Sequence, residues 1–156
     1  MADDTSDRFR LDLARLDPWL RERFPDLTGD IAAQKFAGGQ SNPTYAILVD
    51  GQPRMVLRKK PPGVLLPSAH AVEREYKVTA ALVDTGVPVA RPLALCEDAE
   101  VVGTPFFVME HAAGRNFWDA RLPDMQPAER AAIYDAMITV LARLHAVDPV
   151  AVGLAD

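Results

Sequence analysis

The 156-residue chain has a single cysteine, Cys96, no long apolar run and no excess of basic residues. One cysteine excludes an intrachain disulfide framework and a cysteine-based zinc site. The longest apolar stretches, near 45–49 and 104–109, have the length of strands, whereas a membrane-spanning helix needs ~20 residues. The acidic segment MADDTSDRFRLDL at the N-terminus is unlike a secretory signal, which has a basic region followed by an apolar run. We therefore expect a cytoplasmic protein.

The charge balance argues against two classes of partner. Seventeen Lys and Arg residues stand against 22 Asp and Glu residues, which gives a formal net charge of −5. Nucleic acids and anionic membranes are bound through a strong basic field, so we expect neither as the main partner. Hydrophobic residues make up 49% of the chain and charged residues 25%, the composition of a soluble globular domain with a buried core.

Hydrophobic periodicity and breaker residues predict the secondary structure. Leu13, Leu16 and Leu20 are spaced as on one face of a helix, for which Ser6 is a candidate N-cap and Pro25 the end. A second helix is predicted after Ser68, its candidate cap. That second helix covers 69–84, and a last helix covers 127–146. The predicted strands are 30–37, 43–50, 53–60, 92–98 and 104–110. Asp50-Gly51 predicts a hairpin turn between the second and the third of them.

This order of elements predicts an α+β fold, in which a five-stranded antiparallel sheet packs against one helix. Residues 1–29 form an N-terminal helical extension, 30–110 the sheet and its helix, and 111–126 an irregular linker. The last helix, which starts near Pro127, is predicted to turn one apolar face inward. That face consists of Ile133, Met137, Val140, Leu141 and Leu144.

The turn GGQSN at 38–42 is a candidate binding loop. Main-chain N–H groups that are not crowded by side chains can approach phosphate oxygens, and the hydroxyl of Ser41 can add a hydrogen bond. The alternative is a plain β-turn, because glycine and asparagine are common turn residues.

The third strand carries cations on both faces. Arg58 and Lys60 share one face, and Lys59 points the other way. A cation that projects from this strand can reach nucleotide phosphates if a carboxylate holds it, and the next helix offers Glu73 and Glu75. The alternative is a solvated strand edge whose charges deter aggregation.

The remaining reactive residues support no catalytic or metal site. His145 lies at a helix end, where a structural role is expected. His70 and His111 have no companions at the spacing of metal ligands, and Cys96 lies in an apolar strand that favours an inert core position. We assign no catalytic residue and no metal ligand to the chain.

Four segments resemble the aminoglycoside phosphotransferase family, and most closely its acyl-CoA dehydrogenase-associated subgroup. Members have a protein-kinase-like fold and transfer the γ-phosphoryl group of a nucleoside triphosphate to a hydroxyl. The resemblance implies that 30–110 is a kinase-like N-terminal lobe, 111–126 a hinge or linker, and 127–156 the start of a C-terminal lobe. The segments are FAGGQSNPTY (36–45), MVLRKKPPGVLLPSAHAVEREYKV (55–78), VPVARPLALCED (87–98) and TPFFVMEHAAGR (104–115).

The resemblance also implies a site for ATP or GTP with Mg²⁺. The loop over the phosphates matches Gly39, Ser41 and Asn42. The cation of the third strand matches Arg58, although Lys60 shares its face, and the helix carboxylate that pairs with this cation matches Glu75. The hinge, whose main chain would hydrogen-bond adenine, matches Met109, Glu110 and Ala112.

The family's catalytic loop, His-Gly-Asp followed by Asn, and its later Asp motif do not occur in these 156 residues. Because phosphoryl transfer needs positioned metal ions and a base, we expect a nucleotide-binding lobe that has no transferase activity alone. Its expected partners are a nucleotide and, in a longer parent protein, a small hydroxyl substrate that the subgroup suggests is a hydroxyacyl compound. The alternative is a non-catalytic nucleotide-binding or protein-interaction module. Such a lobe is expected to expose apolar residues near 106–118 and 133–144, and to self-associate or dock on another chain.

Overall fold

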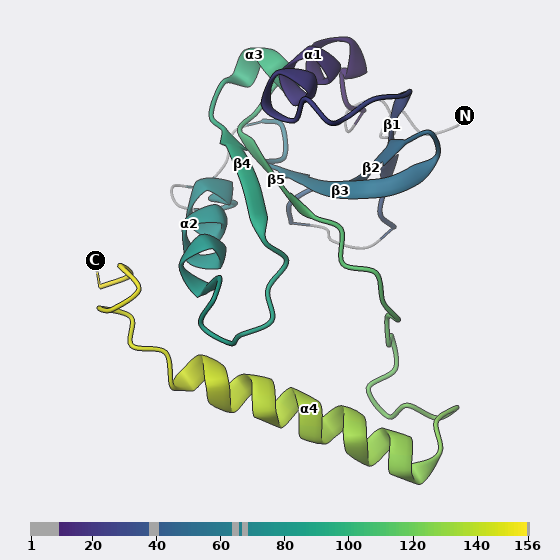
Figure 1. Ribbon diagram of the computed structural model, residues 1–156, viewed down its shortest axis with the longest axis vertical. Helices are drawn as coiled ribbons and strands as arrows, with labels where there is room; N and C mark the ends of the chain where they lie inside the picture. Colours follow the sequence, from purple (N-terminus) through teal and green to yellow (C-terminus); the bar gives the residue numbers. More distant parts are fainter. Residues whose placement is uncertain (1–9, 38–40, 64–65, 67–68, 156) are drawn as a thin grey trace.

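The computed structural model describes residues 10–37, 41–63, 66 and 69–155, which include a single sheet and a long C-terminal helix that is set apart from it (Figure 1). The sheet has five strands in the order β1-β2-β3-β5-β4, and each neighbouring pair is antiparallel. This confirms the predicted α+β fold with a five-stranded antiparallel sheet. The strands are β1 (Ile31–Lys35), β2 (Thr44–Val49), β3 (Gln52–Lys59), β4 (Pro92–Cys96) and β5 (Phe106–Glu110).

The turn between β2 and β3 is a tight hairpin at Asp50-Gly51, as predicted. The φ angles are 49° at Asp50 and 76° at Gly51. Positive φ at both central residues matches the twist of the flanking strands in a two-residue hairpin. This turn helps to set the register in which Thr44 lies opposite Arg58. The predicted turn at Gly38-Gly39 lies outside the described residues.

The hydrophobic core lies between α1 (Leu13–Arg23) and one face of the sheet. Leu16 and Leu20 are fully buried, as their spacing predicted. Full burial of one such side chain stabilises the fold by ~2 kcal/mol. Trp19, which the spacing argument missed, packs edge to face on Phe106 with 4.8 Å between ring centroids. The predicted N-terminal extension therefore shares its core with the sheet.

The start of α1 differs from the prediction. The N-cap is Asp12, whose carboxylate accepts a hydrogen bond from the main-chain N–H of Arg15 at 3.3 Å. An acceptor at this position satisfies an N–H group that the first helical turn leaves unpaired. Ser6, the predicted cap, lies outside the described residues. Pro18 is accommodated inside the helix.

The second helix, α2 (Val72–Leu82), is shorter than the predicted 69–84. His70 has a φ of 59°, in the left-handed region, so the right-handed helix cannot extend back through it. The N-cap is Ala71, which supplies no side-chain hydrogen bond. The prediction of Ser68 as the cap was therefore wrong, and Ser68 itself lies outside the described residues. Val72 is fully buried at the start of the helix.

A short helix that the sequence reading missed, α3 (Ala99–Val102), lies between β4 and β5. The carboxylate of Asp98 accepts a hydrogen bond from the N–H of Glu100 at 2.8 Å, and Gly103 ends the helix with a φ of 84°. The two strands are therefore shorter than the predicted 92–98 and 104–110. A helix of four residues is too short to show a hydrophobic period. Cys96, at the end of β4, is buried as expected.

The last helix, α4 (Pro127–His145), begins at the predicted proline but does not turn its apolar face inward. None of its residues is buried, and Met137 is 61% exposed. Figure 1 shows why, because an extended segment carries the chain from β5 to α4 at the opposite end of the molecule from α1. The prediction of inward-facing residues was therefore wrong. The exposed large apolar residues of α4 are Tyr134, Met137, Ile138, Leu141 and Leu144.

The expected exposure along 106–118 is confirmed only in part. Phe106, Phe107 and Val108 are buried in β5, whereas Phe117 and Trp118 are exposed in the linker, Trp118 by 85%. Within the described ranges, no helix combines the length and apolarity that crossing a membrane requires. The proposed boundaries at residues 29, 110 and 126 stay predictions.

We predict that Gly29→Ala is markedly destabilising. Gly29 has a φ of 105°, and a Cβ atom there would lie 2.3 Å from Oδ2 of Asp50. Asp50 also accepts a hydrogen bond from the N–H of Asp30 at 2.9 Å, so its carboxylate cannot move without losing that bond. Urea denaturation should show a free energy of unfolding lowered by ~2–4 kcal/mol.

Gly51→Ala is the matched control. Gly51 also has a positive φ, 76°, but nothing lies within 4 Å of a Cβ built there. This variant should lose only the backbone penalty of ~1–2 kcal/mol. Equal losses in the two variants would show that the approach of Asp50 does not require glycine at position 29.

Candidate functional site

The three cations at the end of β3 lie on opposite faces of the sheet, as the strand period predicted. Lys59 is 4% exposed, and its Nζ donates to the carbonyl oxygen of Val102 in α3 at 2.6 Å. Arg58 and Lys60 instead reach carboxylates of α2. The face of the sheet beside α2 therefore carries two ion pairs, and the face beside α3 carries one buried lysine.

The first ion pair joins Arg58 to Glu75. Nε of Arg58 donates to Oε2 of Glu75 at 2.5 Å, and Nη2 lies 3.4 Å from Oε1. The side chains are 27% and 37% exposed, so the pair lies at the edge of the protein interior. Nη1 also donates to Oγ1 of Thr44 at 3.0 Å. The guanidinium group is thus held by charge-assisted hydrogen bonds and by the neighbouring strand.

The second ion pair joins Lys60 to Glu73, with 2.8 Å between Nζ and Oε1. Burial alone would raise the pKa of Glu73. The hydrogen bond from Lys60 and its positive charge act in the other direction, and the net effect is a pKa below its usual value. Each of the two predicted carboxylates therefore pairs with one cation, Glu75 with Arg58 and Glu73 with Lys60.

Asn42 connects the first ion pair to the segment before α2. It is 2% exposed, its Nδ2 donates to Oε1 of Glu75 at 2.7 Å, and its Oδ1 lies 2.9 Å from Nδ1 of His70. Its main-chain oxygen lies 3.4 Å from Nη1 of Arg58. Asn42 therefore contacts both members of the pair, with its side chain directed into the protein.

His70 is the residue of this network that sequence reasoning missed. His70 has no companion at the spacing of metal ligands, so no role was expected for it. Its contact joins residues 28 positions apart along the chain. No periodicity or local motif predicts a pairing at that distance.

The other predicted site residues lie near this network or outside the described residues. Gly39 lies outside them, and Ser41 is exposed next to Asn42. Met109 pairs with Val56 in the sheet. Val56 and Arg58 lie two apart on β3, so their side chains point to the same face of the sheet. Met109, opposite Val56, therefore lies on that face as well. Glu110 and Ala112 are exposed, at the end of β5 and just beyond it.

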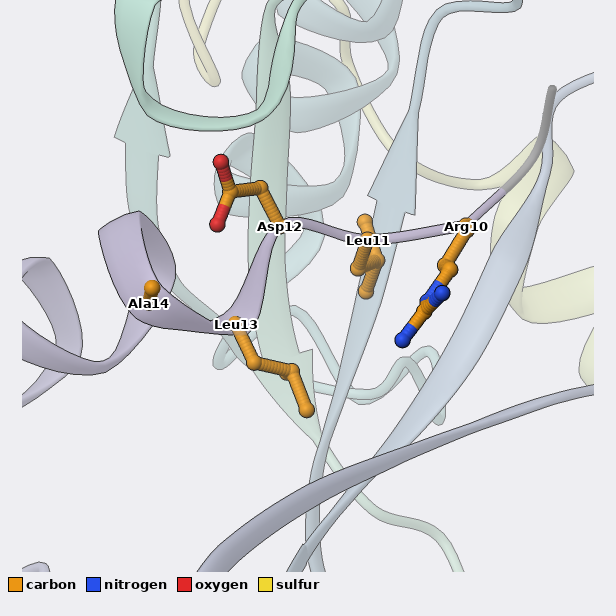
Figure 2. Close-up of a pocket in the computed structure, with 5 residues that line it drawn as sticks. All are labelled: Arg10, Leu11, Asp12, Leu13 and Ala14. Carbon is orange, nitrogen blue, oxygen red and sulfur yellow. The ribbon is translucent and has the colours of Figure 1, made fainter. Parts of the chain in front are cut away.

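Two hollows in the described surface are lined by residues outside this network. One of about 530 Å³ is lined by residues 10–14 (Figure 2). Figure 2 shows the charged ends of Arg10 and Asp12 pointing in different directions, and Asp12 serves as the cap of α1. A second hollow, of about 560 Å³, is lined by linker residues that include Phe117 and Trp118. Across the described ranges, no group of three or more histidine, cysteine, aspartate or glutamate residues lies close enough together to hold a metal ion.

The five-stranded sheet with α2 beside it matches the N-terminal lobe of a kinase-like fold. The chain belongs to the phosphotransferase enzyme family, whose sequence model matches residues 32–156. A solved structure from Ralstonia eutropha JMP134, named a "putative aminoglycoside phosphotransferase", is 46% identical with a TM-score of 0.77. It is matched over 94% of this chain.

The chain is also similar to larger curated proteins. Acyl-CoA dehydrogenase family member 11 of Rattus norvegicus is 44% identical over 93% of this chain, and family member 10 of Mus musculus is 52% identical over 81%. These matches confirm the resemblance to the acyl-CoA dehydrogenase-associated subgroup. The chain spans 19% and 12% of the lengths of these two relatives and 42% of the solved structure.

We predict that Lys59 makes the free energy of unfolding rise with pH in the alkaline range. Burial lowers the pKa of Lys59 from its ordinary value of 10.5. Between the lowered pKa and 10.5 the unfolded chain binds more protons at this site, so its contribution to the free energy of unfolding rises with pH. Below that window the charged, buried lysine carries its full desolvation cost.

The comparison with Lys59→Met isolates this contribution, since methionine fills a similar volume without a charge. Chemical denaturation at pH values from 7 to 10.5 should show the free energy of unfolding of the wild type rising relative to that of the variant. Arg54→Met, at an exposed position of the same strand, is the control. A constant difference between wild type and Lys59→Met would contradict the prediction.

Proposed function

We propose that this chain is the nucleotide-binding lobe of a small-molecule phosphotransferase that uses ATP or GTP with Mg²⁺. The observation that carries the proposal is the Arg58–Glu75 ion pair, which joins the central strand to α2. In kinase-like enzymes a cation of the third strand, held by a helix glutamate, binds the phosphates of the nucleotide.

The geometry of Arg58 suits contact with a phosphate. A guanidinium group has five N–H donors. The described residues provide four acceptor contacts, two on Glu75 and one each on Thr44 and Asn42. Among the described residues, one N–H group is therefore without an acceptor and can donate to an oxygen of a ligand, on a side chain that is 27% exposed. Lys60 is paired with Glu73 rather than with Glu75, so we assign the phosphate contact to Arg58.

The remaining contacts follow from where the family pattern falls on this chain. We assign phosphate binding to the loop of Gly39, Ser41 and Asn42, and adenine binding to main-chain atoms of Glu110 and Ala112 beside Met109. Met109 shares the face of Arg58, so one nucleotide can span the distance between hinge and cation. Mg²⁺ supplies charge neutralisation for the nucleotide phosphates, and no residue of this chain is assigned as its ligand.

The acceptor of the phosphoryl group is a hydroxyl in this proposal. The curated relatives are named acyl-CoA dehydrogenase family members. This favours a hydroxyacyl compound over an aminoglycoside as the acceptor in a longer parent protein. With no base and no metal ligand assigned to these 156 residues, we expect the chain alone to bind nucleotide and to transfer nothing.

Substitution of the two cations tests the proposal by calorimetric titration with Mg²⁺-ATP and Mg²⁺-GTP. Arg58→Ala should weaken binding ~10- to 100-fold, because it removes a charge-assisted hydrogen bond to phosphate. Lys60→Ala should change the dissociation constant less than ~3-fold, as expected for loss of a partly exposed pair. Arg54→Ala is the charge-matched control on the same strand.

Two outcomes contradict the proposal. One is a wild-type chain that is folded but binds neither nucleotide. The other is an equal loss of affinity in Arg58→Ala and Arg54→Ala, which would show a general charge effect rather than a specific contact.

The apolar stripe on α4 favours a second candidate function, a protein-interaction module. The stripe consists of Tyr134, Met137, Ile138, Leu141 and Leu144, whose spacing puts them on one face of the helix. Exposed apolar surface of this kind is typical of interaction sites. We propose that a second copy of the chain covers the stripe.

Light scattering at increasing protein concentration tests this second candidate. The wild type should self-associate, and Ile138→Glu should shift it towards the monomer, because a carboxylate would have to be buried without a partner. Ala136→Glu, an exposed position on the other side of α4, should leave the self-association unchanged. A wild type that is monomeric at all concentrations would rule out self-association.

A further inference from the structure

We infer that His70 is a positioning residue, which acts through Asn42 to hold the Arg58–Glu75 pair in one geometry. The inference rests on the proposed function, since it gives the pair its role in binding nucleotide. It adds to that function a residue for which the family pattern provided no role.

The contacts run in series from His70 to Arg58. Nδ1 of His70 lies 2.9 Å from Oδ1 of Asn42, Nδ2 of Asn42 donates to Oε1 of Glu75 at 2.7 Å, and Oε2 of Glu75 accepts from Nε of Arg58 at 2.5 Å. Asn42 is 2% exposed, so water cannot take the place of these partners of its amide group. Each group in the series is therefore oriented by the one before it.

The chemistry of these groups fixes which atom of His70 carries a proton. An ionised carboxylate only accepts hydrogen bonds, so the atom that Asn42 turns towards Glu75 is its NH₂ group. The amide oxygen then faces His70, and Nδ1 of the imidazole must be the donor. The neutral Nδ1–H tautomer and the imidazolium ion both satisfy this requirement, because Nδ1 is protonated in each.

The consequence for the ion pair follows from its exposure. A partly exposed pair such as this one has freedom to sample several geometries. The hydrogen bond from Asn42 restrains Glu75, and the hydrogen bond from His70 prevents the amide of Asn42 from rotating. Preorganisation of this kind reduces the entropy that a ligand must offset on binding.

Two substitutions separate the hydrogen bond from the backbone conformation. His70 has a φ of 59°, which glycine and asparagine adopt at least cost. His70→Gly keeps the backbone and removes the donor. His70→Asn keeps the backbone and retains a side-chain N–H near the position of Nδ1. Because both variants fit the left-handed conformation, a difference between them reports on the donor.

The test combines NMR spectroscopy of the ¹⁵N-labelled chain with titration of Mg²⁺-ATP. In the wild type, His70 should be protonated on Nδ1 in its neutral form, and the Nε–H of Arg58 should exchange slowly with water. His145→Asn and His111→Asn assign the signals, since the chain has three histidines. His70→Gly should speed that exchange and weaken nucleotide binding ~3- to 10-fold, the effect of one hydrogen bond. His70→Asn should restore both to within ~2-fold of the wild type.

The inference is overturned if His70→Gly leaves the exchange of the Arg58 Nε–H unchanged. It is also overturned if His70→Asn and His70→Gly are equally impaired, since the donor would then not matter. A wild type that binds no nucleotide would end the proposed function. In that case the exchange rate of the Arg58 Nε–H and the tautomer of His70 would still decide whether His70 positions the pair.

Discussion

The alternation of side chains along β3 is the constraint on which this structure depends. β3 is the middle strand of the five, so both of its edges pair with neighbouring strands. Leu57 points into the core beneath α1, and the next residue, Arg58, points towards α2. A register slip of one residue would put the guanidinium group into the core and the leucine into the ion-pair network. The core and the candidate site therefore constrain each other through a single strand.

The Arg58–Glu75 pair joins this strand to α2, and the residues around it explain why the connection is specific. An exposed ion pair alone contributes little to stability, typically ~0–1 kcal/mol. Here Asn42 is buried between the pair and His70, and a buried amide that lost its partners would cost ~1–3 kcal/mol. The network as a whole therefore favours one arrangement of the loop after Ser41, the strand and the helix. The nucleotide binding that we propose needs such an arrangement, because loop, cation and hinge must then face one ligand.

The helix α4 differs from α1 because its apolar face is exposed. Most helices in proteins are stabilised by packing of an apolar face. In α4 that face is exposed along its length. Its contacts to the described part of the sheet region include the hydrogen bond from Nη1 of Arg143 to the carbonyl of Gly86, at 3.4 Å. The relatives that the chain matches are several times longer. A helix with this surface is suited to burial against further protein, whether a second copy or another part of a longer chain.

Sequence alone determined the features that are encoded within a few residues. The dipeptide Asp50-Gly51, which favours positive φ angles, predicted a hairpin. Period-two alternation predicted that Arg58 and Lys59 point in opposite directions. Helical spacing predicted the burial of Leu16 and Leu20. These patterns express local sterics and the separation of apolar from polar groups, so they are readable without coordinates. The motif match added the family and the pairing of Arg58 with Glu75.

Only the tertiary structure decided the features that depend on distant residues. The left-handed backbone at His70 makes α2 begin only at Val72, and the same residue contacts Asn42 across 28 positions of the chain. The apolar spacing of α4 looked the same as that of a buried helix, because periodicity records which face is apolar and not whether anything covers it. Hydrogen bonds between distant side chains and the presence or absence of a packing partner are properties of the folded chain, and no local pattern encodes them.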